Sequence, residues 1–383
     1  MNDEAKGKAT LAARAGGFFD AASGGVVPPI QSSTTFIRDD DYNPLVPGNV
    51  YGRDHNDQVR LAEDILCRME EASDTLLFSS GMAAIGTLLD WLKPGQTLLM
   101  QKGTYWGTTA YARRLCERRN IRLVEADSTE TETFCNTLQE EQPAIVLVEV
   151  PSNPWILMSD IRAIAASCLA NGCRLAVDAT AATPLLMKPL ALGADIVIHS
   201  ATKAINGHSD VLAGVLSCRT HQDDLWQFIK EQRHDGGAIL SAQAAWLLIR
   251  GMRTLPLRLE RMCSTSQAIA DHLENHEKIE DVWYPGLASH EGHELAKRDM
   301  DGGYGYLMSF LVRGGRDDAL RFCANLKGIH RATSLGGVES LVEHRHTLEG
   351  ELTGCPENLI RLSVGIEEPE DLLNELDSAL SAV

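Results

Sequence analysis

The sequence has no long apolar run and no excess of positive charge. None of its apolar stretches approaches the roughly 18 residues that a membrane-spanning helix needs. It carries 35 Lys and Arg residues against 53 Asp and Glu residues, so its formal net charge is −18. Nucleic-acid-binding proteins usually present basic patches, and anionic membranes attract basic segments. We therefore expect neither a nucleic-acid nor a membrane partner.

Signs of a disulfide framework, a zinc site or a signal peptide are also missing. The nine Cys residues are an odd number and include no Cys-x-x-Cys pair. No cluster of His, Cys, Asp and Glu has the spacing of metal ligands. The first residues lack the basic and then apolar pattern of a signal peptide. The sequence therefore predicts a cytoplasmic protein with reduced thiols and no metal.

The 383 residues fall into three segments of different texture. Segment 1–60 is rich in loop signals such as Pro44 and Pro47, and an arm of this kind needs a surface to lie on, for which a neighbouring subunit is one candidate. Segment 61–235 alternates apolar runs with helical patterns, which predicts a large α/β domain whose mostly parallel central sheet is covered on both faces. Segment 236–383 reads as a smaller α+β domain.

Short apolar runs mark the strands that we expect. In the large domain they are 98–100, 121–124, 145–150, 175–177 and 196–198, and in the smaller domain 306–312 and 359–364. One long helical pattern covers 241–276, and a last helix starts near Pro369. Ligands of open α/β sheets lie beyond the carboxyl ends of the strands, so the residues that follow these runs are candidates for a site.

Lys203 lies just beyond the run 196–198, in the segment Ser200-Ala201-Thr202-Lys203. A lysine at the end of a buried strand suits a Schiff-base role, and the hydroxyls of Ser200 and Thr202 are placed to bind a phosphate. An ordinary surface lysine at the start of a loop explains this segment equally well when it is taken alone.

Two other expected strand ends and the start of one helical pattern carry residues that suit a phosphorylated ring. Asp178 follows 175–177, where an acid can pair with a cationic ring nitrogen, although a helix N-cap is a common role for Asp. Gly81 and Met82 open a helical pattern whose N-terminus can hold an anion, and a plain capped turn is the alternative. Tyr105 follows 98–100 and can stack on a flat ring or simply pack in the core.

Taken together and in this order, these segments resemble the Cys/Met-metabolism family of pyridoxal phosphate enzymes, which includes cystathionine γ-synthase, cystathionine lyases and methionine γ-lyase. The resemblance covers nearly the whole chain. Its main segments are 25–30, 79–85, 151–154, 193–197, 199–203, 207–210, 334–341 and 361–367. It implies an α/β, aspartate-aminotransferase-like (type I) fold, pyridoxal 5′-phosphate as cofactor, and a homodimer with shared active sites, usually paired into a homotetramer.

The resemblance also implies roles for individual residues. Lys203 would form the Schiff base and move protons, Asp178 would hold the pyridine nitrogen, and Tyr105 would stack on the ring and assist proton transfer. The residues implied to hold the phosphate are Gly81, Met82, Ser200 and Thr202, together with Tyr51 and Arg53 from the neighbouring subunit. The residues implied at the substrate carboxylate are Arg361, whose guanidinium suits bidentate binding, and its neighbours Asn153 and Ser334.

The sequence departs from the family pattern where a distal carboxylate is bound. Members that act on cystathionine or O-succinylhomoserine often carry Arg where this sequence has Asp54 and Ala110. An acid repels a distal carboxylate, so Asp54 favours a cationic or hydrogen-bond-donating distal group, unless it is only a solvated loop residue. Glu339 indicates chemistry at Cγ, because its counterpart accompanies γ-synthases and γ-lyases in the family.

The sequence therefore predicts a pyridoxal-phosphate-dependent lyase or γ-replacement enzyme that acts on an L-amino acid with a leaving group at Cγ. Canavanine, whose Cγ bears an oxyguanidine, is the sharpest substrate hypothesis. Two alternatives remain open. One is cystathionine γ-synthesis or γ- or β-elimination from cystathionine, and the other is a binding protein that carries the cofactor without turnover.

Overall fold

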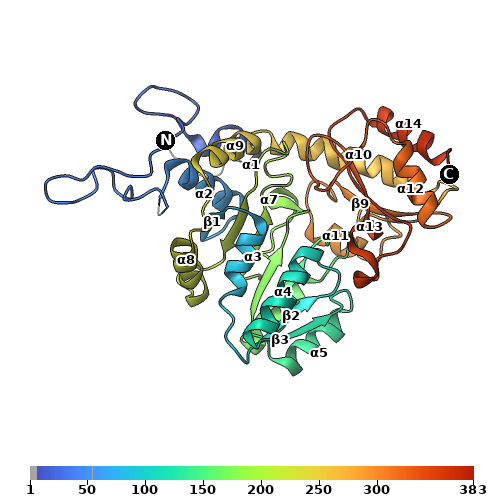
Figure 1. Cartoon of the computed structure of the whole chain (residues 1–383), viewed down its shortest axis with the longest axis horizontal. Helices are drawn as coiled ribbons and strands as arrows, with labels where there is room; N and C mark the ends of the chain where they lie inside the picture. The colour runs from blue at the N-terminus through green and yellow to red at the C-terminus, as the bar shows by residue number, and fades with distance from the viewer. Residues whose placement is uncertain (1–6, 54) are drawn as a thin grey trace.

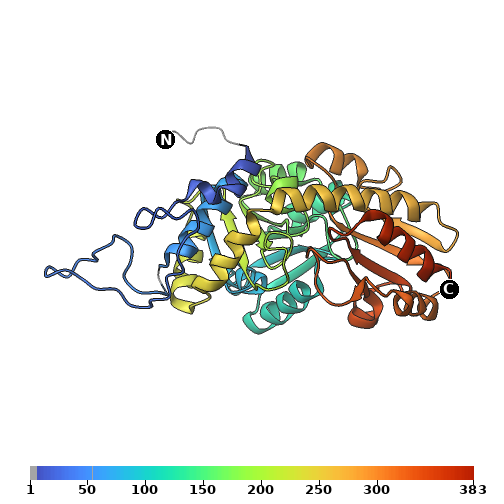
Figure 2. The ribbon, with the colours of Figure 1, turned by 90° about the horizontal axis from the view of Figure 1, so that it is seen from above.

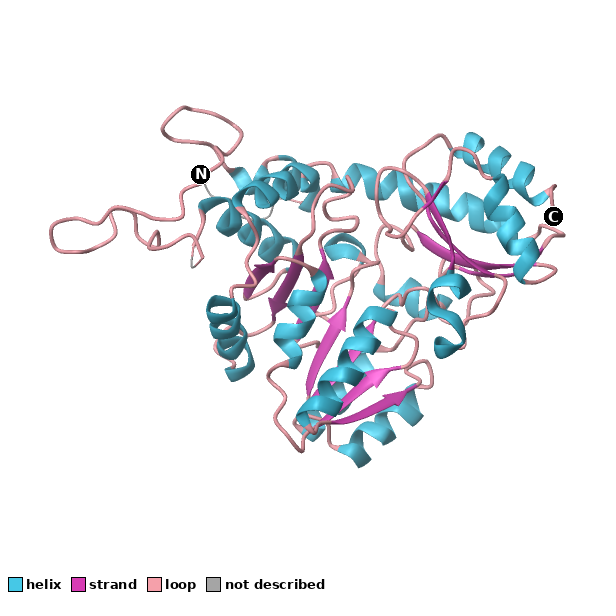
Figure 3. Cartoon of the chain, viewed as in Figure 1, coloured by secondary structure: helices cyan, strands magenta, loops and turns pink. Residues whose placement is uncertain are grey.

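The computed structural model describes residues 7–53 and 55–383, and only the backbone at 351 and 352. Its strands gather in two separate sheets (Figure 1, Figure 3). The larger sheet has the order β1-β7-β6-β5-β4-β2-β3. Its strands are β1 (Asp74–Phe78), β2 (Thr97–Gln101), β3 (Arg122–Ala126), β4 (Ile145–Glu149), β5 (Arg174–Asp178), β6 (Ile196–Ser200) and β7 (Gly214–Cys218).

The five runs predicted in the large domain are β2 to β6, and their neighbours are paired in parallel. The prediction of a mostly parallel central sheet is confirmed, and the departure from parallel pairing lies at one side. Strand β7 runs antiparallel to β6 and to β1. Both missed strands contain polar residues, such as Asp74 and Ser217, which interrupt the apolar pattern.

Side chains of the central strands alternate between two cores, as the period of two in a strand requires. In β4, Val146 and Val148 belong to the core under α5 (Thr131–Glu141) and α6 (Ile161–Asn171). Ile145 and Leu147 belong to the opposite core. The helices of that second core are α3 (Gly81–Leu89), α4 (Trp106–Arg119) and α8 (Asp224–Gly236). The predicted coverage of both faces is confirmed.

The chain leaves β2 towards β3 on one side, whereas β4 lies on the other side of β2. Such a reversal creates a crevice at the carboxyl ends of the two adjacent strands, where open α/β sheets bind ligands. Tyr105 follows β2, and Asn153 follows β4. The topology therefore brings two of the predicted site residues to the same crevice.

The smaller sheet has the order β10-β11-β12-β9-β8. Its strands are β8 (Ile279–Trp283), β9 (Leu307–Val312), β10 (His330–Arg331), β11 (Leu341–His344) and β12 (Leu359–Ser363). The helices α12 (Arg316–Asn325) and α14 (Pro369–Leu380) pack on it and bury Phe322 and Leu376. The remaining short elements of the chain are α1 (Lys8–Ala13), η1 (Ala15–Gly17), α7 (Thr183–Leu186), α11 (His293–Asp299), α13 (Arg345–Glu349) and η2 (Gly350–Thr353).

The long helix expected over 241–276 is two helices, α9 (Ala242–Met252) and α10 (Leu255–Glu274). The break falls just before Pro256, which is tolerated in the first turn of a helix but not in its interior. Helix α9 packs with α2 (Asp57–Glu70) in the large domain. Helix α10 buries Leu259 and Met262 in the core of the large domain and Ile269 and Leu273 in that of the smaller one. Figure 2 shows α10 spanning both parts.

The segment that precedes α2 projects from the body as long loops (Figure 1, Figure 2). Several apolar side chains on it are exposed, among them Ile37 at 78%, Tyr42 at 79% and Leu45 at 64%. Covering such exposed apolar side chains with another protein surface lowers the free energy, so they favour a protein–protein contact. Among the residues that the structure describes, no helix is both long and apolar enough to cross a membrane.

Candidate active site

A cavity of about 310 Å³ opens at the carboxyl ends of β2, β4, β5 and β6, and the smaller domain closes one side of it. The predicted site residues that line it are Gly81, Met82, Tyr105, Asn153, Asp178, Ser200, Thr202, Lys203, Ser334 and Arg361. The fold thus brings together ten residues that are spread over 280 positions of the sequence.

Lys203 follows β6 and points its amine towards the smaller domain. Its Nζ donates a hydrogen bond to Ser334 Oγ at 3.0 Å. Burial, with a further contribution from the positive charge of Arg361, lowers the pKa of Lys203 to about 8, although Glu343 opposes the shift. A lysine with such a pKa is partly neutral near pH 7.5, and only the neutral amine attacks an aldehyde.

Asp178 ends β5 and is held by Thr180, two residues further on. Its Oδ1 accepts hydrogen bonds from the Thr180 backbone N at 3.0 Å and from Thr180 Oγ1 at 2.5 Å. Burial raises the pKa of Asp178, and the hydrogen bonds from Thr180 oppose that shift. Thr180 Oγ1 also accepts from the Ser200 backbone N at 2.8 Å, which ties this acid to the strand that carries Lys203.

The first turn of α3 forms a cradle for an anion. Ser80 caps the helix by accepting a hydrogen bond from Ala83 N at 3.1 Å. The backbone packs so tightly here that a Cβ atom on Gly81 would lie 2.9 Å from the Cβ of Ser200. A Cβ on Gly214 would lie 2.1 Å from the backbone oxygen of Ser80. Glycine at both places lets the helix N-terminus, with its unpaired N–H groups, approach the hydroxyls after β6.

Glu149 is a residue of the cavity wall that the sequence analysis missed. It ends β4 and lies beside Asp178 in the sheet register. Its Oε2 accepts from the Tyr105 backbone N at 2.5 Å, and its Oε1 accepts from Asn153 N at 3.3 Å. Burial, together with the nearby charge of Asp178, raises the pKa of Glu149 well above its usual range. Glu149 therefore positions the loops that carry Tyr105 and Asn153.

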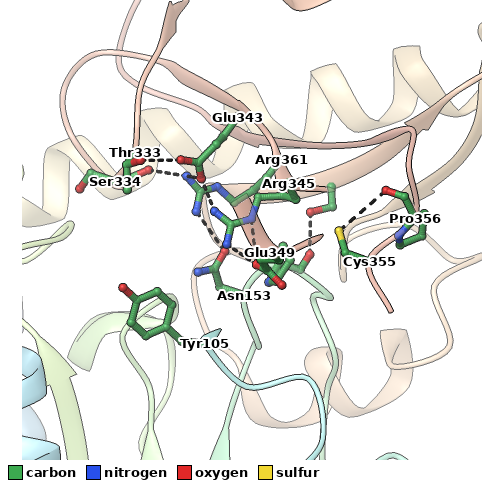
Figure 4. Close-up of polar contacts among 12 residues, drawn as sticks. Tyr105, Asn153, Thr333, Ser334, Glu343, Arg345, Glu349, Cys355, Pro356 and Arg361 are labelled. Atoms are coloured by element: carbon green, nitrogen blue, oxygen red, sulfur yellow. Dashed lines mark hydrogen bonds and ion pairs between the residues drawn. The ribbon is translucent and has the colours of Figure 1, made fainter. Parts of the chain in front are cut away.

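Arg361 on β12 forms the wall opposite the large sheet (Figure 4). Its Nη1 donates to Asn153 Oδ1 at 3.2 Å, and its Nη2 donates to the backbone oxygen of Ser334 at 2.8 Å and pairs with Glu343 Oε2 at 2.8 Å. Among the described residues, its buried Nε has no acceptor. Burial lowers the pKa of Arg361 to about 10, so the guanidinium stays charged near neutral pH.

Three predicted residues do not line this cavity in the part of the chain that the structure describes, and a fourth lies outside that part. Tyr51 and Arg53 are exposed, and the Arg53 guanidinium lies 5.9 Å from the centre of the Tyr51 ring. Glu339 accepts a hydrogen bond from Ser209 and lies outside the cavity wall. Asp54 lies outside the described residues. The roles predicted for these four residues stay predictions.

The residues in the cavity fit pyridoxal phosphate. They supply a lysine of lowered pKa, a buried acid for the ring nitrogen, a glycine-lined helix N-terminus for a phosphate, and a buried Arg361 Nε that is left for a carboxylate. When bound, this cofactor acts as an electron sink that stabilises negative charge at the substrate Cα. No group of three or more His, Cys, Asp and Glu side chains among the described residues could hold a metal ion.

Comparison with known proteins agrees with this fit. The family model of the Cys/Met metabolism PLP-dependent enzymes matches residues 9–381. The chain is 37% identical to a cystathionine γ-lyase from Dictyostelium discoideum, covering 96% of this chain and 95% of the relative. It is 38% identical to a cystathionine γ-synthase from Mycobacterium tuberculosis, covering 98% and 97%.

A solved structure gives the same answer for the fold. The cystathionine γ-synthase from Xanthomonas oryzae, in complex with aminoacrylate and cysteine, superposes with a TM-score of 0.94 at 36% identity. The match covers 99% of this chain and 98% of that one. The predicted type I fold and the predicted cofactor are therefore confirmed. The chain belongs to the Cys/Met metabolism family of pyridoxal-phosphate-dependent enzymes.

Proposed function

We propose that this enzyme eliminates or replaces a leaving group at Cγ of an L-amino acid. The observation that carries the proposal is that the relatives reported above are all named for chemistry at the γ position, at 36–38% identity over nearly the full chain. Glu339 also supports chemistry at Cγ, because a glutamate at this position accompanies the γ-synthases and γ-lyases of the family.

The residues of the cavity have roles that follow from their surroundings. Arg361 would bind the substrate carboxylate, and the amine of Lys203 would carry protons between carbon atoms of the substrate. Burial raises the pKa of Tyr105, so its hydroxyl keeps its proton near neutral pH and can give it up only in a catalytic step. Gly81, Met82, Ser200 and Thr202 hold the phosphate, and Asp178 keeps the ring nitrogen protonated.

For the substrate, we propose a distal group that is cationic or donates hydrogen bonds, as in canavanine. The support is the sequence pattern, in which Asp54 and Ala110 stand where relatives that bind a distal carboxylate carry arginines. Cystathionine remains the second candidate because the relatives reported above are named for it. If the cationic hypothesis holds, Asp54→Asn lowers kcat/KM for canavanine about thirtyfold while that for O-acetylhomoserine barely changes.

A substrate panel tests the proposal. Canavanine, O-acetylhomoserine and cystathionine are each incubated with the holoenzyme, and ammonia, 2-oxo acid and homoserine are quantified. Asp57→Asn, a change of a nearby exposed acid, is the matched control for Asp54→Asn. Products of β-cleavage alone would refute the γ proposal. An unchanged ratio of canavanine to O-acetylhomoserine kcat/KM in Asp54→Asn would refute the cationic distal group.

We also propose that the protein is a cytoplasmic homodimer and that two dimers pair into a homotetramer. In each dimer, the arm of residues 1–60 contributes to the active site of the neighbouring subunit. The exposed apolar side chains of the arm support this, since a second subunit would cover them. All nine cysteines are free, which agrees with a reducing compartment. Tyr51 and Arg53 would then reach the phosphate bound by the partner.

A further inference from the structure

Four buried side chains of alternating charge form a chain that ends at the cavity (Figure 4). In order they are Arg361, Glu343, Arg345 and Glu349, and none is more than 7% exposed. We refer to these four residues as the charge chain. The family resemblance assigned a role to Arg361 alone, and the other three residues lie on β11 and α13.

Glu343 is shared between the two arginines. Its Oε2 pairs with Arg361 Nη2 at 2.8 Å and also accepts from Arg345 Nη1. Its Oε1 accepts a hydrogen bond from Thr333 Oγ1 at 2.7 Å. On the far side of Arg345, Glu349 Oε1 accepts from Nε at 3.1 Å and from Nη2. All three nitrogens of Arg345 therefore donate to carboxylates of the chain itself.

Arg361 stands at the open end of this arrangement. Both arginines contribute to the described cavity wall, whereas neither glutamate does. Arg345 is flanked by two carboxylates, whereas among the described residues Arg361 pairs with one, and that one is shared. Nε of Arg361 has no acceptor among the described residues. A ligand carboxylate bound to Arg361 would be the next negative charge in this series of alternating charges.

The sharing of Glu343 matters because a buried carboxylate paired only with Arg361 would compete with the substrate. In a low-dielectric site, the attraction between two unit charges is several times stronger than in water. A substrate carboxylate would then have to displace, or lie beside, an unshielded negative charge. Arg345 offsets this charge, although part of its own positive charge is balanced by Glu349 on its far side.

We propose that Arg345 is a positioning residue for substrate binding: it holds Glu343 so that Arg361 stays able to bind the α-carboxylate. This inference rests on the proposed function only in taking an L-amino acid as the ligand of Arg361. It predicts the direction in which the affinity for a carboxylate ligand changes. Removing Arg345 weakens binding of a carboxylate ligand, and removing Glu343 as well restores that binding.

The test measures binding of L-norvaline and of its amide, L-norvalinamide, to the holoenzyme by titration calorimetry. Norvaline has no leaving group, so the result does not depend on whether the reaction is a γ-elimination. We expect Arg345→Gln to weaken norvaline binding about tenfold, about 1.4 kcal/mol, and to leave norvalinamide binding within about twofold. We expect the double variant Arg345→Gln/Glu343→Gln to recover most of the lost norvaline affinity.

Two further variants separate this role from simple packing. Glu349→Gln leaves Arg345 with Glu343 as its one carboxylate partner, so we expect norvaline binding to stay equal or become tighter. Arg298→Gln is the matched control, because Arg298 also pairs with two carboxylates, those of Asp160 and Asp299, outside the cavity. We expect it to leave both ligands unaffected.

The proposal is overturned if the double variant binds norvaline no better than Arg345→Gln, or if Glu349→Gln weakens binding as Arg345→Gln does. Equal losses for norvaline and its amide would also overturn it, since a general distortion of the site affects both ligands. If Arg345→Gln fails to fold, Glu349→Gln and Arg345→Lys carry the test. The lysine variant keeps the charge but loses the fork, so it is expected to fall between wild type and Arg345→Gln.

Discussion

The amine of Lys203 offers a prediction whose size follows from the cavity. Burial and the nearby charge of Arg361 lower its pKa from an ordinary 10.5 to about 8. At pH 7.5 a lysine with a pKa of about 8 is roughly one quarter neutral, whereas one with the ordinary value is about one thousandth neutral. The neutral, reactive form of Lys203 is thus enriched roughly two hundredfold over that of an ordinary lysine. We expect Lys203 of the cofactor-free enzyme to react with a carbonyl reagent faster than an ordinary lysine by about this factor.

The assay is reductive methylation with formaldehyde across pH 6 to 11, followed by mass spectrometry of the peptide that contains Lys203. The rate should rise with pH and level off above about 8, because deprotonation is then nearly complete. The exposed Lys297 in the same digest corrects for loss of reagent. Arg361→Gln removes a nearby positive charge, so the midpoint for Lys203 should move to higher pH, although burial keeps it below 10.5.

This reasoning has two ways to fail. A midpoint at or above pH 10 in the cofactor-free wild type would mean that the amine is not desolvated as the cavity indicates. A midpoint that moves to lower pH in Arg361→Gln would mean that the charge of Arg361 does not act on Lys203. Either result would remove the physical basis for treating this lysine as the nucleophile.

Borohydride reduction of the holoenzyme should fix the cofactor on the peptide of Lys203, and Lys203→Ala should abolish turnover; an adduct on any other lysine would overturn the assignment. Mixing inactive Lys203→Ala with inactive Arg53→Ala should restore part of the activity, since a hybrid dimer holds one intact site, and no recovery despite proven subunit exchange would count against shared sites. Gly214→Ala should lower cofactor affinity at least tenfold and reduce the melting temperature, because its Cβ meets a backbone oxygen at 2.1 Å that cannot move aside; fluorescence titration and thermal unfolding check this.

The residues at the ends of the central strands could be predicted from the sequence because each follows a run of apolar residues. Lys203, Asp178 and Tyr105 were found in this way, and the cavity contains all three. Glu149 has the equivalent place in the structure, since it is the last residue of β4 as Asp178 is the last residue of β5. It was missed because an acid within an apolar run reads as part of the strand, and the neighbouring loops that it holds are apparent only in three dimensions.

The charge chain could not be predicted in the same way. Glu343 and Arg345 are two residues apart, a spacing that is ordinary on any solvated surface. The burial of Glu343 follows from the pairing of β11 with β12, which sets it opposite Arg361, and Arg345 is buried in the first turn of α13. Strands β1 and β7 were missed for a related reason. Antiparallel pairing and helix cover bury them, although the polar residues in their sequences obscure it.

Helix α10, which contributes to both cores, has a consequence for how the protein unfolds. Neither domain has a complete hydrophobic core unless this one helix is formed, since Leu259 and Met262 complete one core while Ile269 and Leu273 complete the other. Loss of either half of the helix therefore exposes apolar surface in the domain that contains that half. The two domains are then coupled into a single cooperative unit. Calorimetry of the subunit should show one transition, and a fragment that ends at residue 260 should not keep the large domain folded.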